Sequence, residues 1–213
     1  MTIGPVRLDI FSDPVCPWCY VGKANLDRAL AAHPEHPFVI EWHPFQLNPD
    51  MPPEGVDKRA YLERKFGGKA RVDAIHERLR EVARAAGVDL DPDRPQRMPN
   101  TLNAHRLIHW AGIEGVQPVV VAGLMRAYWA EGRDIGDRAS LAEIAGENGM
   151  DRRATLRLLQ SDADADDIAA RDRDARYKGV TAVPTFLIAR HYVVSGAQPP
   201  ETWGKVIEEI AAR

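Results

Sequence analysis

The chain has 213 residues, of which 45% are hydrophobic and 28% charged, proportions that are typical of a folded globular protein. This length allows one domain, or one domain with a large insertion, to bury a substantial core. The 31 acidic and 28 basic residues nearly balance, which argues against nucleic acid or an anionic membrane as the partner. No stretch approaches the roughly 20 apolar residues of a membrane span. Residues 1–10 show no signal-peptide pattern, so we expect a cytoplasmic protein.

The N-terminal part of the chain predicts a strand, a helix and a second strand. Residues 6–11 alternate apolar and polar side chains and lead into a Ser-Asp-Pro turn. A helical pattern then runs from Cys16 to His33 and Pro34, and residues 38–42 form the second predicted strand. We expect the two strands to pair in parallel through a right-handed crossover.

The middle of the chain, residues 57–178, carries almost no strand signal and predicts a helical block. Apolar side chains recur there at helical spacing, as in Val72, Ile75 and Leu79. Breaks between several helices of modest length are expected at Gly87, residues 91–99, Gly115, residues 132–137 and Gly149. The acidic run at residues 162–167 is either an interaction segment or, as we prefer, the solvated start of a helix.

Strand signals return after Gly179. Residues 184–188 and 192–194 predict a hairpin, and a final helix follows Pro199 and Pro200. The sequence therefore predicts an α/β protein in which residues 1–56 and 179–213 form one domain and residues 57–178 form an inserted helical domain.

The segment Cys16-Pro17-Trp18-Cys19 lies at the start of the first predicted helix. Unpaired backbone N–H groups and the helix dipole favour a thiolate there, so Cys16 is the candidate nucleophile. Pro17 suits the first helical turn because it lacks an N–H group. Cys19, three residues on, lies within bonding reach and is the candidate resolving thiol.

Two other interpretations of the cysteine pair stay open at this point. The pair could be half of a structural zinc site, although the chain has no second pair and its histidines lack zinc-binding spacing. The two thiols could also be inert core residues. The Val183–Pro184 step is similarly ambiguous, since it is either a plain strand boundary or a cis peptide that lies against the redox pair.

Several further side chains have both a functional and a structural interpretation. His43 could tune the Cys16 thiolate or contact substrate, or it could pair locally at the end of its strand. Arg106, next to His105, could hold a carboxylate or pack the helices. We expect Trp18 to be exposed beside the nucleophile. The remaining tryptophans are expected in the core, namely Trp42, Trp110, Trp129 and Trp203.

Several segments together resemble the DsbA family, specifically its FrnE-like branch. They are residues 12–20 around the cysteines, 42–49, 100–107, 131–136, 183–186 and 194–198. The resemblance implies a thioredoxin fold with a large all-helical insertion between the second strand and the cis-proline strand, and a redox-active disulfide between Cys16 and Cys19. It also implies a cis peptide bond before Pro184. We predict that the substrate-binding residues are Pro17, Trp18, Val183, Pro184, His43 and Phe45.

The same branch is similar to the kappa-class glutathione transferases and the 2-hydroxychromene-2-carboxylate isomerases, which carry serine where this chain has Cys16. Since only the cysteine pair can form a disulfide, we expect a thiol–disulfide oxidoreductase acting on protein or small-molecule thiols and disulfides. A glutathione-dependent isomerase or transferase is the alternative, and a non-enzymatic binding module is a third hypothesis. We expect a monomer or homodimer with no metal or cofactor, and glutathione as a candidate thiol co-substrate.

Overall fold

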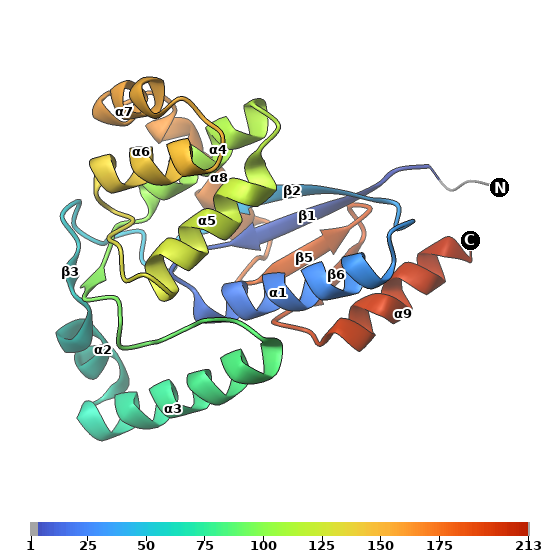
Figure 1. Ribbon diagram of the computed structural model, residues 1–213, viewed down its shortest axis with the longest axis horizontal. Helices are drawn as coiled ribbons and strands as arrows, with labels where there is room; N and C mark the ends of the chain where they lie inside the picture. The colour runs from blue at the N-terminus through green and yellow to red at the C-terminus, as the bar shows by residue number, and fades with distance from the viewer. Residues whose placement is uncertain (1–3, 213) are drawn as a thin grey trace.

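The computed structural model describes residues 4–212, and Figure 1 shows a small sheet with a helical block at one end of it. The sheet has the strand order β2-β1-β5-β6, with β1 and β2 parallel and the other neighbours antiparallel. Its strands are β1 (Val6–Ser12), β2 (Phe38–Pro44), β5 (Thr185–Ile188) and β6 (Tyr192–Ser195). The predicted parallel pair and the predicted hairpin are therefore confirmed.

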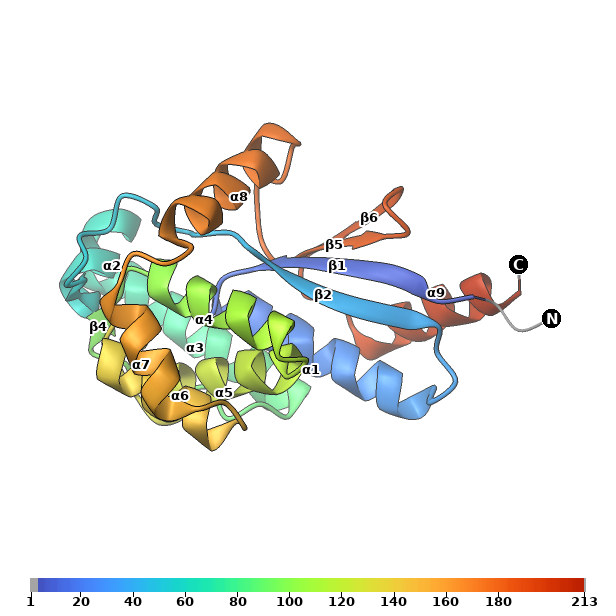
Figure 2. The same cartoon turned by 90° about the horizontal axis from the view of Figure 1, so that it is seen from above.

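Two helices, α1 (Pro17–Ala32) and α9 (Pro200–Ala211), pack side by side against one face of the sheet (Figure 2). Strand β1 turns Leu8 and Ile10 toward this face, and both are fully buried. Across the layer, the ring of Phe186 meets that of Trp203 edge to face with centroids 4.7 Å apart. This packing confirms the core position predicted for Trp203.

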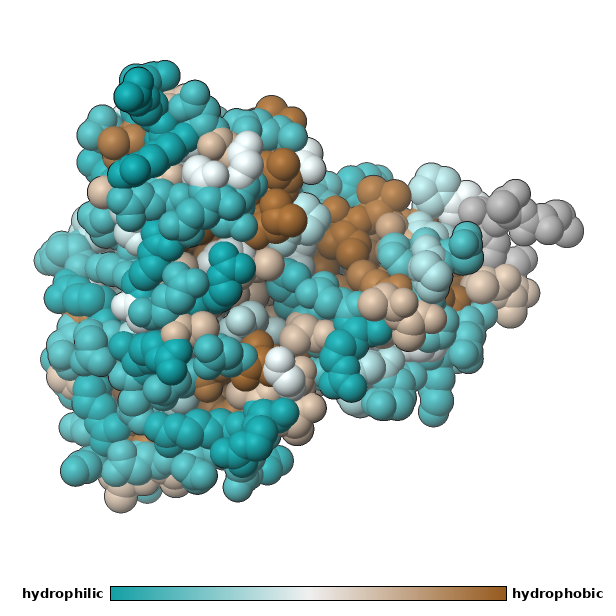
Figure 3. Space-filling model, in the orientation of Figure 1, coloured by the Kyte–Doolittle hydropathy of each residue, from teal (hydrophilic) through white to brown (hydrophobic). Residues whose placement is uncertain are grey.

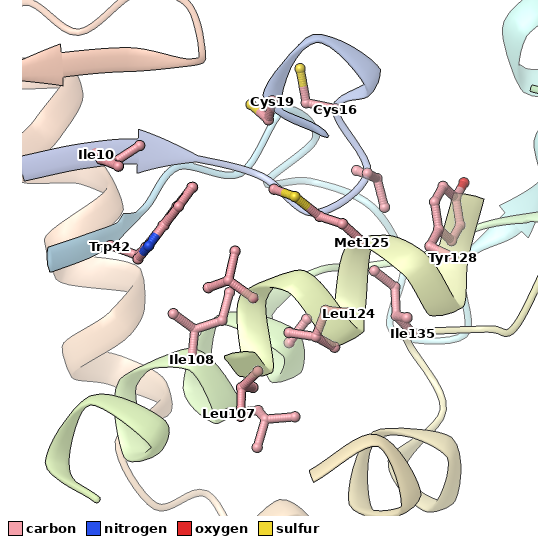
Figure 4. Packing of buried hydrophobic residues seen from close by; sticks show 14 of the residues in the cluster. Ile10, Cys16, Cys19, Trp42, Leu107, Ile108, Leu124, Met125, Tyr128 and Ile135 are labelled. Carbon is pink, nitrogen blue, oxygen red and sulfur yellow. The ribbon is translucent and has the colours of Figure 1, made fainter. Parts of the chain in front are cut away.

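The helical block surrounds a second part of the same core. It consists of α2 (Lys58–Phe66), α3 (Lys69–Ala86), α4 (Leu102–Ile113), α5 (Gln117–Trp129), α6 (Arg138–Glu147), α7 (Arg152–Gln160) and α8 (Ala165–Tyr177). Figure 4 shows side chains of α4 and α5 packed toward the sheet residues Ile10 and Trp42. The Gln117 side chain ties α5 to β2 by accepting from the Trp42 N–H at 2.8 Å.

The sequence-predicted helix breaks coincide with the ends of these helices. The acidic run begins α8, with Asp166 and Asp167 in the first turn, as predicted. Two short strands that the sequence did not predict, β3 (Val56–Asp57) and β4 (Arg97–Met98), pair with each other beside α2. Hydrophilic residues cover most of the helical block, and apolar residues gather over the sheet beside α1 (Figure 3). Among residues 4–212, no helix combines the length and the apolar character that crossing a bilayer requires.

Candidate active site

The cysteine pair lies where the chain leaves β1 and enters α1. Cys16 is the N-cap residue of α1, with an extended backbone, and Pro17 occupies the first helical turn. The Cys19 N–H donates to the Cys16 carbonyl at 3.1 Å, so the two residues lie in one turn. Both cysteines are free thiols, and Figure 4 shows them close together at the start of the helix. The position predicted for Cys16 at a helix N-terminus is confirmed.

Both thiols are buried. Cys16 is 3% exposed and Cys19 1% exposed, so exposure hardly distinguishes the two sulfurs. Burial, reinforced by the neighbouring Cys16, raises the pKa of the Cys19 thiol well above its ordinary value. Cys16 differs from Cys19 in bordering a cavity.

The loop before β5 covers Cys16. The Val183–Pro184 peptide is cis, and the Cys16 thiol donates to the Val183 carbonyl at 3.6 Å. The Thr185 hydroxyl, at the start of β5, donates to the Ala182 carbonyl at 2.7 Å. This hydrogen bond connects the loop to the strand. Backbone of this loop therefore faces Cys16 directly.

A cavity of about 340 Å³ extends from Cys16 to the facing sides of α2 and α3. Its lining is mostly apolar; the side chains include Trp18, Tyr61, Leu62, Phe66, Val72, Ile75, Leu79, Met98, Trp129 and Val183. Trp18 is 42% exposed, as predicted for a residue beside the nucleophile. The cavity thus offers an apolar surface next to the thiol that would attack a substrate.

Two lysines supply positive charge at this cavity. Lys58 is 3% exposed, donates to the Pro92 carbonyl, and has its amine 5.3 Å from the centre of the Trp129 ring. Burial lowers the pKa of Lys58 to about 8, so part of its population is neutral at slightly alkaline pH. Lys65 donates to both Asn48 and Tyr61 at 3.1 Å.

Beneath the motif, Asp13 is fully buried and holds three segments together. Its carboxylate accepts from the Leu47 N–H at 2.7 Å, from the Val15 N–H at 3.4 Å and from the Thr101 hydroxyl at 3.4 Å. The neighbouring His105 Nε2 lies 3.7 Å from the same carboxylate. Burial raises the pKa of Asp13 to about 7 and lowers that of His105 to about 4.

Two residues that the resemblance assigns to substrate binding lie away from the cavity. His43 projects from the opposite face of the sheet, where Nε2 pairs with Asp9 at 2.7 Å and the ring stacks on Phe11. The Phe45 side chain is 2% exposed and packs in the core under the Arg176 guanidinium, 4.0 Å away. The strand alternation of β2 explains the position of His43, since its side chain points away from the face that carries α1.

The surroundings of His43 also bear on metal binding. Asp9, Glu41 and His43 place one ligand atom each within 4.8 Å of one another, a geometry that could accept a cation. Arg7 pairs with both carboxylates at 2.7 Å and Arg171 lies 3.9 Å from Glu41, so two guanidinium groups offset the two carboxylate charges. We therefore interpret this cluster as a salt-bridge network of the sheet face.

Five other residues singled out in the sequence, namely four tryptophans and Arg106, have structural roles. The four remaining tryptophans are all buried. The Arg106 guanidinium donates to the carbonyls of Leu158, Ser161 and Ala163 and thereby connects α4 to the α7–α8 turn. It is a packing residue in this structure.

Local sequence patterns do not identify the residues around the motif that come from elsewhere in the chain. Lys58, Tyr61 and the apolar side chains of α3 are ordinary helix residues, and only tertiary packing brings them to Cys16. Ser12 and Asp13 match the pattern of a turn, but a polar pair between a buried strand and a cysteine motif is also a signal that identifies candidate site residues.

The chain is similar to several known proteins over almost its whole length. A probable DsbA oxidoreductase from Streptomyces coelicolor is 32% identical, with 98% of this chain and 91% of that one covered and a TM-score of 0.87. An uncharacterized protein of Bacillus subtilis is 26% identical over 96% of both chains. A cytosolic disulfide reductase from Pseudomonas aeruginosa, DsbM solved with glutathione, is 19% identical, with coverage of 97% and 100% and a TM-score of 0.70.

The predicted thioredoxin fold with its helical insertion is thus confirmed. The sequence model of the family of DSBA-like thioredoxin domains matches residues 7–208, and this chain belongs to that family.

Proposed function

We propose that the protein is a thiol–disulfide oxidoreductase that exchanges disulfides with protein or small-molecule substrates through Cys16 and Cys19. The observation that carries the proposal is the position of Cys16. Its sulfur sits at a helix N-terminus, 3.6 Å from the Val183 carbonyl, and borders an apolar cavity. A substrate disulfide entering the cavity meets the nucleophile and the loop backbone together.

The reaction needs only the two cysteines. The Cys16 thiolate attacks one sulfur of a substrate disulfide, forming a mixed disulfide and releasing the other sulfur as a thiolate that takes up a proton. The Cys19 thiolate then attacks the Cys16 sulfur, which forms the Cys16–Cys19 disulfide and releases the second substrate thiol. Two electrons and two protons pass from the protein to the substrate, and the reverse sequence oxidises a dithiol.

The lining of the cavity supports a role for Trp18 and Val183 in holding the substrate. Trp18 offers an exposed apolar face, and the Val183 backbone lies beside the attacking sulfur. Pro17 and Pro184 shape the two backbone segments that meet at Cys16. These four residues remain the proposed substrate contacts, whereas His43 and Phe45 do not reach the cavity.

Glutathione is the small thiol that this proposal includes. The relative named DsbM was solved with glutathione, and the present cavity combines apolar surface with the amines of Lys58 and Lys65, which suit a carboxylate-bearing thiol. A cytoplasmic location, as expected from the sequence, would expose the pair to the glutathione pool and keep it largely reduced. Reduction of substrate disulfides would then be the favoured direction.

The decisive experiment measures the thiol–disulfide equilibrium of the pure protein in glutathione redox buffers, together with insulin reduction. We expect the wild type to show a two-electron transition and catalysis, and Cys16→Ser to show neither. The absence of a Cys16–Cys19 disulfide in the oxidising buffers would contradict the proposal. An active Cys16→Ser variant with glutathione-dependent turnover would favour the isomerase or transferase alternative, whose relatives carry serine at this position.

A further inference from the structure

Ser12, the last residue of β1, has a buried hydroxyl that the fold itself does not use. The residue is 4% exposed, and its backbone carbonyl accepts from the Phe45 N–H at 3.2 Å. Among residues 4–212, however, the Ser12 hydroxyl oxygen has no hydrogen-bond partner. Buried polar groups are nearly always paired, so an unpaired hydroxyl beside reactive residues indicates a partner that appears in another state of the molecule.

The reactive group that interacts with the Ser12 hydroxyl is the thiol of Cys19, in the first turn of the helix that follows β1. The hydroxyl favours the Cys19 thiolate over the thiol, as does the backbone N–H of Asp13, whereas burial and the neighbouring Cys16 favour the thiol. In the dithiol form the sulfur is a weak acceptor and the hydroxyl stays unpaired. A thiolate is a strong acceptor, so the hydrogen bond forms when Cys19 loses its proton.

We propose that Ser12 is a catalytic residue of the exchange reaction, in which its hydroxyl donates a hydrogen bond to the Cys19 thiolate as that thiolate attacks Cys16. This inference rests on the proposed function. The Cys19 proton passes to the substrate thiolate released in the first step. The second step forms the Cys16–Cys19 bond, breaks the bond between Cys16 and the substrate sulfur, and discharges the second thiolate. Ser12 keeps its own proton throughout.

Ser12 takes part in only one half of the reaction, the resolution of the mixed disulfide. Cys16 is the N-cap residue of α1 and borders the cavity, and its thiol donates to the Val183 carbonyl. Cys19 lies within the first turn, is 1% exposed and does not border the cavity, so water does not solvate a negative charge there. Loss of the Ser12 hydroxyl should therefore slow resolution of the mixed disulfide and leave its formation unchanged.

Ellman's reagent allows formation and resolution of the mixed disulfide to be measured separately. Cys16 releases one coloured thiolate when it attacks the reagent, and Cys19 releases the second when it resolves the mixed disulfide, so a stopped-flow trace has two phases. For Ser12→Ala we expect the second phase to slow roughly tenfold and its pH midpoint to move upward, because a hydrogen bond to a charged group is lost. Ser12→Thr, which keeps the hydroxyl, should restore most of the rate.

The matched control is Thr155→Val, which removes another buried hydroxyl in the distant helix α7, where it donates to the Asp151 carbonyl at 2.8 Å. Both phases should keep their wild-type rates. An unchanged second phase in Ser12→Ala would overturn the proposal, and so would equal slowing of both phases, which indicates general distortion. A wild-type trace without any second phase would instead overturn the proposed function, so the two failures are distinguishable.

Discussion

Strand β1 and the residue after it, Asp13, contribute side chains to two polar environments that differ in how their charges are paired. On one face, Asp9 joins Glu41 and His43 in a cluster where Arg7 pairs with both carboxylates. At the carboxyl end of the strand, Ser12 and Asp13 lie buried under the cysteine pair, and neither is matched by a permanent opposite charge. The two regions lie a few residues apart on one strand.

The difference shows which polar side chains are available for chemistry. The cluster around His43 looks more like a functional site by composition, since it combines a histidine with two carboxylates. Its charged groups nevertheless form ion pairs and hydrogen bonds with one another, so few of their donors and acceptors are free to bind a substrate. The groups near Cys16 are fewer, but burial leaves them with shifted pKa values or without a partner, conditions that are common at reactive sites.

The largest effect that tests this contrast should come from Cys19→Ser. Without the resolving thiol, the mixed disulfide between Cys16 and a substrate cannot be discharged from within the protein, so turnover should stop after one attack. Intact-mass measurement after incubation with oxidised glutathione should show one glutathione per chain, held until an external thiol is added. A rapid return to the free protein would contradict the assignment of Cys19.

A second, intermediate effect concerns the stability contributed by Asp13. Because burial raises the pKa of Asp13 from 3.8 to about 7, the folded chain holds this proton more tightly than the unfolded chain. The stabilisation is complete below about pH 4 and is lost as the pH rises through about 7. The side chain in Asp13→Asn cannot ionise. The difference in the free energy of unfolding, variant minus wild type, should therefore increase by up to about 1.4 kcal/mol per pH unit in that range.

Urea unfolding of both proteins from pH 4 to pH 8 measures this difference. Burial lowers the pKa of His105 to about 4, so its own contribution is lost as the pH falls through that value. That contribution is shared by both proteins and should largely cancel in the difference. A gap between variant and wild type that stays constant with pH would show that Asp13 is ionised throughout.

The smallest effect is expected on the opposite face of the sheet. His43→Ala should leave both phases of the reaction with Ellman's reagent within about twofold of the wild type, because the histidine does not reach the cavity. Loss of its hydrogen bond to Asp9 should lower the free energy of unfolding by about 1–2 kcal/mol. A selective tenfold loss of exchange rate would instead restore His43 to the active site.

Local sequence signals were enough to predict the elements that carry the reactive atoms. Alternation identified β1, β2 and the hairpin, helical spacing identified the block between them, and the position of Cys16 before Pro17 predicted a thiol at a helix N-terminus. These features depend on neighbours in the chain, so they could be read directly from it. The proposal of Cys16 as the nucleophile rests on the same local signals.

The tertiary structure decided what surrounds those atoms. Whether His43 or Lys58 reaches Cys16 depends on which face of a strand or helix each side chain occupies and on how α2 and α3 pack. The burial of Ser12 and Asp13 likewise depends on segments far along the chain, including Leu47 and Thr101. Spacing along a sequence does not encode such distances, because they result from the balance of packing over the whole core.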